Sequence, residues 1–195
     1  IANEVAALGV QVHGGMGFVE ETGAAQHSRD ARILPIYEGT NGIQANDLVG
    51  RKLMQDKGKA MRELITEMQQ TITNLAQNDG DDLAVVQQAL NNAVDSLQAA
   101  TEWLLDMMPR DPNAALANAM NYMMLSGYVI GGWHMANAAI LAKDRLSAGD
   151  NSGFYEAKLI TARFYAEQIL PKANALLSTV QNGGQSVLAL AEEQF

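Results

Sequence analysis

The fold of most of this chain is decided by residues 59–77, KAMRELITEMQQTITNLAQ. Apolar side chains recur there at steps of three and four residues, namely Met61, Leu64, Ile65, Met68, Ile72 and Leu75. This spacing places them on one face of an α-helix and leaves the polar residues on the other face. We therefore predict an amphipathic helix over this range that buries one face against other helices.

Three further stretches with helical spacing follow, and the breaks between them are short. They cover approximately residues 81–108, 112–146 and 152–180. Short connections make successive helices antiparallel neighbours. The sequence therefore predicts an all-α fold, in which residues 57–195 form an accessory up-down four-helix bundle that follows a first helical segment, residues 1–56.

Individual residues predict where these helices begin, end and bend. Asn78-Asp79-Gly80 ends the first helix, and Asp81 or Asp82 is expected to cap the second. Asp111 is the expected N-cap of the third helix, with proline at its first position. Pro171 lies inside the last helix and predicts a kink, because proline lacks an N–H and clashes with the preceding turn.

Composition and charge restrict the classes of function. The 195 residues are 48% hydrophobic but only 6% aromatic, which favours packed helices over sheets. Acidic residues outnumber basic ones by 22 to 13 and no basic cluster is visible, which argues against nucleic acid and anionic membranes as partners. Cysteine is absent, which excludes disulfides, thiolate metal sites and a cysteine nucleophile. No apolar run approaches the length of a membrane span, and we expect a cytoplasmic protein. The chain begins at Ile1 inside an apparent helix, which suggests a fragment of a longer protein.

A short non-helical link near the beginning of the chain, Ile36–Gln44, carries one carboxylate, Glu38. Gly39 follows it and leaves open backbone that a ligand could approach closely. Thr40 or Asn41 can cap the helix predicted from Asn41 to about residue 54, whose first free N–H groups would face a bound anion. Taken alone, the carboxylate is also explained as a favourable charge at the positive end of a helix dipole.

Two groups of glycines also predict local structure, one as a turn and one as a close contact of a helix. The run Gly14–Phe18 follows the first predicted helix and is expected to form a tight turn, which either ends that helix or binds a phosphate from outside. It is not a dinucleotide fingerprint, because a helix rather than a strand precedes it. Gly127, Gly131 and Gly132 lie within one predicted helix and indicate a tight helix crossing or a subunit contact. His134 lies beside them and is expected to be packed or on the surface rather than a metal ligand.

Three motifs in order carry a resemblance to a known family. They are Gln11-Val12-His13-Gly14-Gly15-Met16-Gly17-Phe18, Arg29-Asp30-Ala31-Arg32-Ile33 and Ile36-Tyr37-Glu38-Gly39-Thr40-Asn41-Gly42-Ile43-Gln44. With these motifs, residues 1–56 resemble the C-terminal end of the acyl-CoA dehydrogenases, flavoproteins that oxidise acyl-CoA thioesters. The remainder is similar to the extra helical domain found in the branch that contains methylmercaptopropionyl-CoA dehydrogenase.

The resemblance implies a role for each matching residue. Glu38 matches the catalytic base that removes the α-proton of the thioester, and Gly39 matches the position where backbone lies against the substrate. The residues that match FAD-contacting positions are Gln11, Val12, His13, Gly14, Gly15, Thr40, Asn41 and Gly42. In the family, the segment matched by residues 11–15 commonly contacts the FAD of a neighbouring subunit.

The same resemblance implies partners and a limit. It implies FAD as cofactor, an acyl-CoA substrate, an electron-transfer flavoprotein as electron acceptor and a homo-oligomer, either a dimer or a tetramer, in fatty acid metabolism. The family needs an N-terminal helical domain and a middle β-domain to hold flavin and acyl-CoA, so the chain alone is expected to be inactive. A helical interaction or oligomerisation module without catalysis of its own is the alternative.

Overall fold

The computed structural model describes residues 1–78 and 80–194, and every regular element in that part of the chain is a helix. The predicted all-α fold is confirmed. The chain divides into two compact units, Ile1–Gln44 and Ala45–Phe195, so the division falls inside one helix. The domain boundary predicted after residue 56 stays a prediction.

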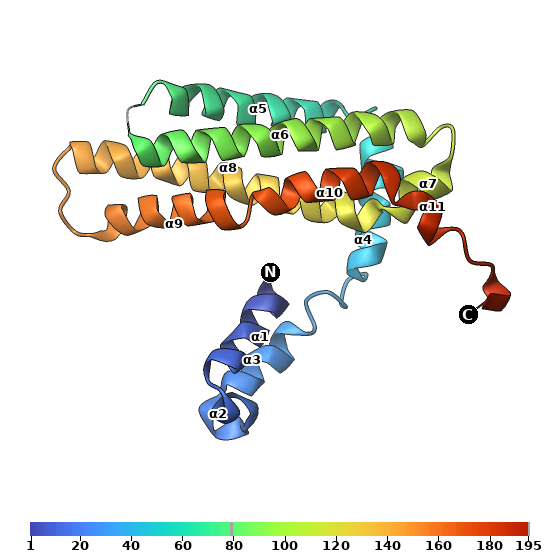
Figure 1. Ribbon diagram of the computed structural model, residues 1–195, viewed down its shortest axis with the longest axis horizontal. Helices are drawn as coiled ribbons and strands as arrows, with labels where there is room; N and C mark the ends of the chain where they lie inside the picture. Colours follow the sequence, from blue (N-terminus) through green and yellow to red (C-terminus); the bar gives the residue numbers. More distant parts are fainter. Residues whose placement is uncertain (79, 195) are drawn as a thin grey trace. The chain divides into compact units, whose positions relative to one another are not determined.

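In the first unit, two antiparallel helices pack against each other (Figure 1). The elements are α1 (Ala2–Val12), α2 (Gly15–Phe18), the 3-10 turn η1 (Glu20–Thr22), α3 (Ala24–Ala31) and the beginning of α4 (Asn41–Asp47). The Asn3 side-chain amide donates to the carbonyl oxygen of Ala31 at 2.9 Å, which joins the beginning of α1 to the end of α3. The end of α1 therefore lies beside the beginning of α3.

The prediction of a tight turn at Gly14–Phe18 is wrong, because these residues include one turn of α-helix, α2. Gly14 reverses the chain with a φ of +60°, a value that suits glycine. At Gly17, an added Cβ would collide with the carbonyl oxygen of Val10. Two glycines thus allow α2 to fold back onto α1 where a simple turn was expected.

The second unit contains the helical bundle. Its elements are the end of α4, the π-helical turn η2 (Leu48–Leu53), α5 (Lys59–Ala76), α6 (Asp81–Met107), α7 (Pro112–Ala117), α8 (Ala119–Ser147), α9 (Phe154–Gln168), α10 (Pro171–Asn182), α11 (Gly184–Val187) and the 3-10 turn η3 (Glu192–Gln194). Both α6 and α8 contact α5, α9 and α10 (Figure 1). These two long helices are therefore the centre of a four-helix bundle whose fourth member is α9 continued by α10.

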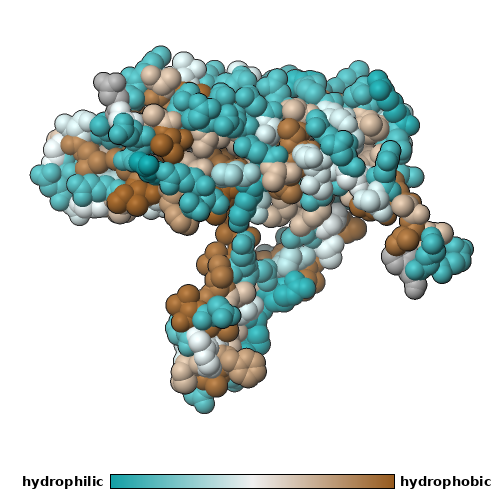
Figure 2. Space-filling view, viewed as in Figure 1, coloured by the Kyte–Doolittle hydropathy of each residue, from teal (hydrophilic) through white to brown (hydrophobic). Residues whose placement is uncertain are grey.

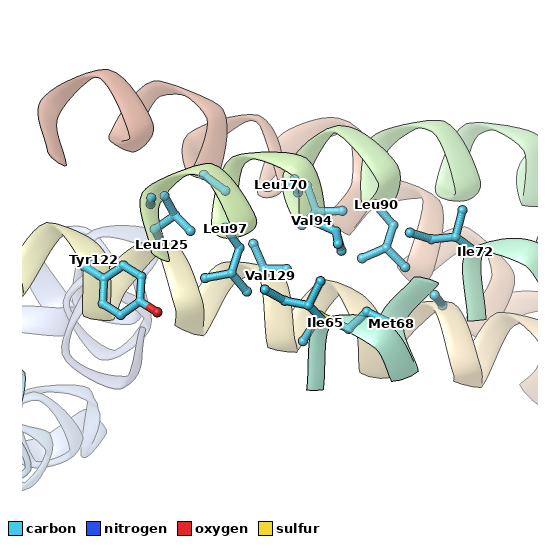
Figure 3. Close-up of a cluster of buried hydrophobic side chains, with 14 of the residues drawn as sticks. Ile65, Met68, Ile72, Leu90, Val94, Leu97, Tyr122, Leu125, Val129 and Leu170 are labelled. Atoms are coloured by element: carbon cyan, nitrogen blue, oxygen red, sulfur yellow. The ribbon is translucent and has the colours of Figure 1, made fainter. Parts of the chain in front are cut away.

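The core of the bundle is built from the predicted apolar faces. On α5, the residues Ile65, Met68, Ile72 and Leu75 are buried, as the opening pattern predicts. They meet Leu90, Val94 and Leu97 of α6, Leu125 and Val129 of α8, and Leu170 (Figure 3). Tyr122 is fully buried in the same cluster, and its hydroxyl lies 2.9 Å from the Thr101 hydroxyl. Burial raises the pKa of the Tyr122 hydroxyl, so this tyrosine stays neutral and hydrogen-bonded.

Two helices that the sequence predicts as continuous are interrupted. The helix predicted over 112–146 stops at Asn118, whose backbone is non-helical and separates α7 from α8. The buried Asn118 side chain accepts a hydrogen bond from the Asn121 amide at 3.1 Å, and such local bonds compete with helical ones. At Pro171 the expected kink is a complete break between Gln168 and Pro171, because the ring excludes the helical carbonyl four residues earlier.

One of the two predicted helix N-caps in the bundle is confirmed and the other is wrong. Asp111 caps α7 as expected, and its carboxylate accepts a bond from the Ala114 amide at 3.1 Å. The prediction that Asp81 or Asp82 caps α6 is wrong, because Gly80 occupies that position with a φ of +141°. Asp82 instead accepts a hydrogen bond from Arg163 at 2.8 Å, which connects α6 to α9. The predicted stop before α6 includes Asp79, which lies outside the described residues.

The helix predicted from Asn41 to about residue 54 changes its hydrogen-bond pattern halfway, at the π-helical turn η2. Asp47 directly precedes this turn, and the Arg51 guanidinium, within the turn, donates to both of its carboxylate oxygens, at 2.5 and 2.8 Å. These bonds hold the pKa of the Asp47 carboxyl below its usual range. An Asp47 carboxylate therefore stays charged beside Arg51 over the wide helical turn.

Two of the three glycines in α8 mark a tight crossing. The Tyr165 hydroxyl lies against Gly131 and donates to the carbonyl oxygen of Tyr128 at 3.1 Å. At Gly132, an added Cβ would lie 2.6 Å from a terminal methyl group of Leu170, which is only 2% exposed. Nothing lies within 4 Å of a Cβ built on Gly127. Gly131 and Gly132 thus serve the contact of α8 with α9 and Leu170.

Alanine substitutions at Gly132 and Gly127 should therefore have opposite effects. Gly132→Ala should lower the free energy of unfolding of the bundle by about 1–2 kcal/mol, because the buried Leu170 side chain has little room to move. Gly127→Ala, the matched control, should raise it by about 0.5–1 kcal/mol through better helix propensity. Urea unfolding of the chain followed by circular dichroism measures both, and equal stabilisation by the two substitutions would contradict the tight crossing.

Candidate active site

The carboxylate of interest lies on the link between α3 and α4. The link is a series of turns in which the Ile36 and Tyr37 amides both donate to the carbonyl oxygen of Ile33, at 2.9 and 3.2 Å. The Glu38 side chain points from this link as an exposed group. It makes no hydrogen bond or ion pair with any described residue, so only the main chain, through the direction of the Cα–Cβ bond, restrains where the carboxylate lies.

The main chain at Glu38 has an unusual conformation. Its φ is +56°, in the left-handed region, and Gly39 follows with a φ of +90°. A residue with a Cβ costs about 1–2 kcal/mol more in this region than in the ordinary helical region. Within the described residues only Glu38 and Lys57 adopt a positive φ without being glycine. Such strained positions cluster at functional sites, where the surrounding structure maintains them.

Hydrogen bonds from the beginning of α4 surround the strained residue. The Gln44 side-chain amide donates to the carbonyl oxygen of Glu38 at 2.7 Å. The Asn41 amide donates to the carbonyl oxygen of Pro35 at 3.1 Å, and the Gln44 amide to that of Thr40 at 2.9 Å. Of the two predicted capping residues, Thr40 acts as the cap, since its hydroxyl lies 3.4 Å from the amide nitrogen of Ile43. The link and the beginning of α4 therefore form one hydrogen-bonded unit.

The predicted cofactor-binding run, Gln11–Gly15, is exposed along its whole length at the end of α1. The Nδ1 atom of His13 lies 2.9 Å from the carbonyl oxygen of Gly9. Because a carbonyl oxygen only accepts, Nδ1 is the donor in this contact, and His13 is otherwise exposed. Nothing lies within 4 Å of a Cβ built on Gly14 or Gly15, so the backbone there is open to a ligand.

The two groups of predicted site residues lie at opposite ends of the α1–α3 pair. Glu38, Gly39, Thr40, Asn41 and Gly42 follow the end of α3, which is bonded to the beginning of α1. The run at residues 11–15 lies at the other end of α1, and the 11 residues of this helix span about 16 Å. The structure thus brings the catalytic and Thr40–Gly42 positions together and separates the 11–15 run from them.

The first unit also carries many exposed apolar side chains. Helix α1 buries no residue, and Val5, Leu8 and Val12 are each more than half exposed. Figure 2 shows apolar side chains gathered along this part of the chain. Ile36 and Tyr37, which directly precede Glu38, are 47% and 50% exposed. The carboxylate therefore stands beside apolar surface, which suits an acyl chain or a flavin ring better than a polar ligand.

Other site types gain no support from the geometry. Among residues 1–78 and 80–194, no group of three His, Cys, Asp or Glu side chains is placed to hold a metal ion. His134 is exposed, and its ring stacks at a tilt against Trp133 with the centroids 5.0 Å apart. None of the helices in the described part of the chain combines the length and apolar character needed to cross a bilayer.

Comparison with known protein families gives two matches that together cover most of the chain. The family description "Acyl-CoA dehydrogenase, C-terminal domain" matches residues 1–54, and "Acetyl-CoA dehydrogenase C-terminal like" matches residues 64–191. The chain belongs to the acyl-CoA dehydrogenase family. The resemblance carried by the three motifs near its beginning is therefore confirmed.

Two relatives match the chain almost end to end, and a third matches only part of it. The chain is 43% identical to 3-methylmercaptopropionyl-CoA dehydrogenase from Ruegeria pomeroyi, over 96% of its own length and 32% of that protein. It is 30% identical to the broad-specificity linear acyl-CoA dehydrogenase FadE5 from Mycobacterium tuberculosis, over 95% and 32%. A subunit of the caffeyl-CoA reductase–Etf complex, CarC from Acetobacterium woodii, is 42% identical over 27% of the chain and 14% of CarC. The chain spans about a third of the length of the first two relatives.

One contact was not predicted from the sequence, namely the bond from Gln44 to the Glu38 carbonyl. The positive φ of Glu38 was not predicted either, because glutamate has no preference for that region. The glycine directly after Glu38 was a partial signal, since glycine often marks a left-handed turn.

If the left-handed backbone at Glu38 is strained, replacement by glycine should relieve it. Glu38→Gly should hold the link and the beginning of α4 more firmly than Glu38→Ala, by about 1 kcal/mol. Both replacements remove the carboxylate, so the comparison isolates the backbone. Hydrogen exchange of the Asn41 and Gln44 amides measures the effect as about fivefold slower exchange in the glycine variant. Equal or faster exchange in that variant would show that no strain is present.

Proposed function

We propose that this chain is the C-terminal part of an FAD-dependent acyl-CoA dehydrogenase that oxidises an acyl-CoA thioester to the 2,3-enoyl-CoA. One observation carries the proposal. In a chain of this family, a single exposed carboxylate, Glu38, lies on a left-handed link directly before an exposed glycine, Gly39. A base needs this combination, because it must reach the substrate carbon and must then be covered by the substrate and cofactor.

In the proposed reaction, Glu38 acts on the carbon next to the thioester carbonyl. Its carboxylate takes the α-hydrogen as a proton and becomes a carboxylic acid, while the electrons of the broken C–H bond form the new carbon–carbon double bond. FAD, when bound, accepts the β-hydrogen together with both of its bonding electrons. We propose that the thioester lies against the exposed backbone of Gly39, on the side that the Gln44 amide leaves uncovered. Ile36 and Tyr37 supply apolar surface that would help to exclude water from the Glu38 carboxylate.

The residues proposed to hold FAD fit such a group. Thr40 directly precedes α4, and Asn41 and Gly42 are its first residues. The Asn41 N–H already donates to the carbonyl oxygen of Pro35, so we propose that the Thr40 hydroxyl, the Asn41 side chain and the Gly42 backbone meet the flavin. Gly14 and Gly15 supply open backbone, and Gln11, Val12 and His13 beside them are exposed. Because the two groups lie toward opposite ends of α1, we propose that they contact different parts of a flavin or two flavins. The second arrangement requires a homo-oligomer, a dimer or a tetramer, in which one subunit contributes the 11–15 run to its neighbour.

The proposed electron acceptor is an electron-transfer flavoprotein. CarC, one of the relatives, is named as a subunit of a complex that contains Etf. The alternative, a helical interaction module without catalysis, is less well supported. The two glycines that suggested a subunit contact, Gly131 and Gly132, instead face Tyr165 and Leu170 of the same chain.

Replacing the proposed base tests the function directly. In the full-length protein that contains this chain, Glu38→Gln keeps the size of the side chain but removes the base. Substrate-dependent reduction of the flavin should fall by at least about 10²-fold, while the visible absorption spectrum of the bound FAD stays unchanged. Stopped-flow absorbance measures both quantities. Near-normal reduction by this variant would refute the assignment.

The chain alone should neither retain FAD nor oxidise acyl-CoA, because it spans about a third of its relatives and offers only exposed segments to the flavin. Purification of the chain followed by flavin fluorescence after denaturation measures the bound cofactor. FAD that copurifies at a ratio of one per chain would contradict this expectation.

A further inference from the structure

The position of the Glu38 carboxylate depends on its own main chain. No described side chain hydrogen-bonds or pairs with the carboxylate, and the residue is exposed. A change in the φ of Glu38 therefore moves the carboxylate without opposition from its surroundings. Whatever maintains the left-handed conformation at this residue also determines the direction in which the side chain of the base leaves the main chain.

One side chain restrains that main chain. The Gln44 amide donates to the carbonyl oxygen of Glu38 at 2.7 Å, across six residues of sequence. The main chain of Gln44 is itself fixed, because its amide donates to the carbonyl oxygen of Thr40 at 2.9 Å in the first turn of α4. The bond thus joins the carbonyl group of the strained residue to a helix.

The glycine after Glu38 makes this bond possible. A Cβ built on Gly39 would lie 3.0 Å from the Gln44 side-chain nitrogen and 3.6 Å from a methyl group of Ile43. The Gln44 amide therefore crosses the space that a side chain at position 39 would occupy. Gly39 accordingly has two functions here, since it adopts a φ of +90° and admits the Gln44 amide.

We propose that Gln44 is a positioning residue for the base: its amide holds the Glu38 carbonyl, and with it the left-handed turn that points the carboxylate at the α-carbon of the substrate. This inference rests on the proposed function of Glu38. Gln44 does not touch the reacting atoms and acts only through Glu38. A small displacement of a base from the reacting carbon slows proton transfer strongly, so loss of the bond should appear in the chemical step.

The test uses the full-length holoenzyme and the variant Gln44→Met, which keeps the length and the helix propensity of the side chain but removes the N–H donor. The matched control is Asn46→Met, at an exposed position two residues further along α4. Gln44→Met should slow flavin reduction at saturating substrate by about tenfold with little change in KM. The primary isotope effect with α-deuterated acyl-CoA should rise, while the flavin spectrum and stoichiometry stay at the wild-type values. Asn46→Met should change none of these quantities.

A second variant separates positioning from simple stability. Gln44→Lys restores a donor on a longer side chain and should recover part of the rate of flavin reduction. An unchanged rate in Gln44→Met, or a loss shared equally by Asn46→Met, would overturn the positioning role. Loss of FAD from Gln44→Met would also overturn it, since the residue would then support cofactor binding. Glu38→Gln in the same assay reports on the proposed function, because normal turnover in that variant refutes the base itself whatever Gln44 does.

Discussion

The bundle depends on the close approach of α8 to α9 and to Leu170, which Gly131 and Gly132 permit. The Tyr165 ring and the Leu170 side chain occupy the positions that side chains on these glycines would fill. With these contacts in place, the Tyr165 hydroxyl reaches the carbonyl oxygen of Tyr128, and Leu170 joins the buried cluster of α5, α6 and α8. Burial raises the pKa of the Tyr165 hydroxyl, which keeps it protonated as a donor. The break before Pro171 follows from the same geometry, because it lets the chain direct Leu170 inward and then continue as α10 along both central helices.

The sequence predicts the parts of this fold in which large apolar residues repeat. The stripe on α5 is the clearest case, since Ile65, Met68 and Ile72 are buried as their spacing requires. Helix α8 is harder, because much of its buried face consists of alanines such as Ala136, Ala139 and Ala142, whereas the larger Leu141 is 52% exposed. Alanine carries little hydrophobic signal and is equally common on helix surfaces, so periodicity cannot assign that face. The break at Asn118 is accompanied by a local hydrogen bond between the Asn121 and Asn118 side chains, and the presence of two asparagines does not by itself predict it.

The sequence motifs predicted which residues form the candidate site, but not the backbone conformation at Glu38. The motifs identify Glu38 and its neighbours, and the family assignment of the whole chain supports that choice. The left-handed backbone at Glu38 contradicts the local preference of glutamate, and it arises because Gly39, Thr40 and Gln44 together maintain it. Departures from local rules are expected where a site needs an unusual geometry, which agrees with the role proposed for Glu38.

The energies at the link explain why several groups are needed there. The left-handed conformation of Glu38 costs about 1–2 kcal/mol, whereas one exposed hydrogen bond contributes about 0.5–1.5 kcal/mol. The Gln44 bond alone is therefore only comparable to the strain, and the bonds from the Asn41 amide to the Pro35 carbonyl and from the Ile43 amide to the Thr40 hydroxyl must contribute as well. A carboxylate packed among other side chains would be easier to fix, but it could not be reached by a thioester. Placing the restraints on the backbone leaves the Glu38 side chain exposed, as the proposed role of a base requires, and the direction of that side chain then depends on the hydrogen bonds of α4.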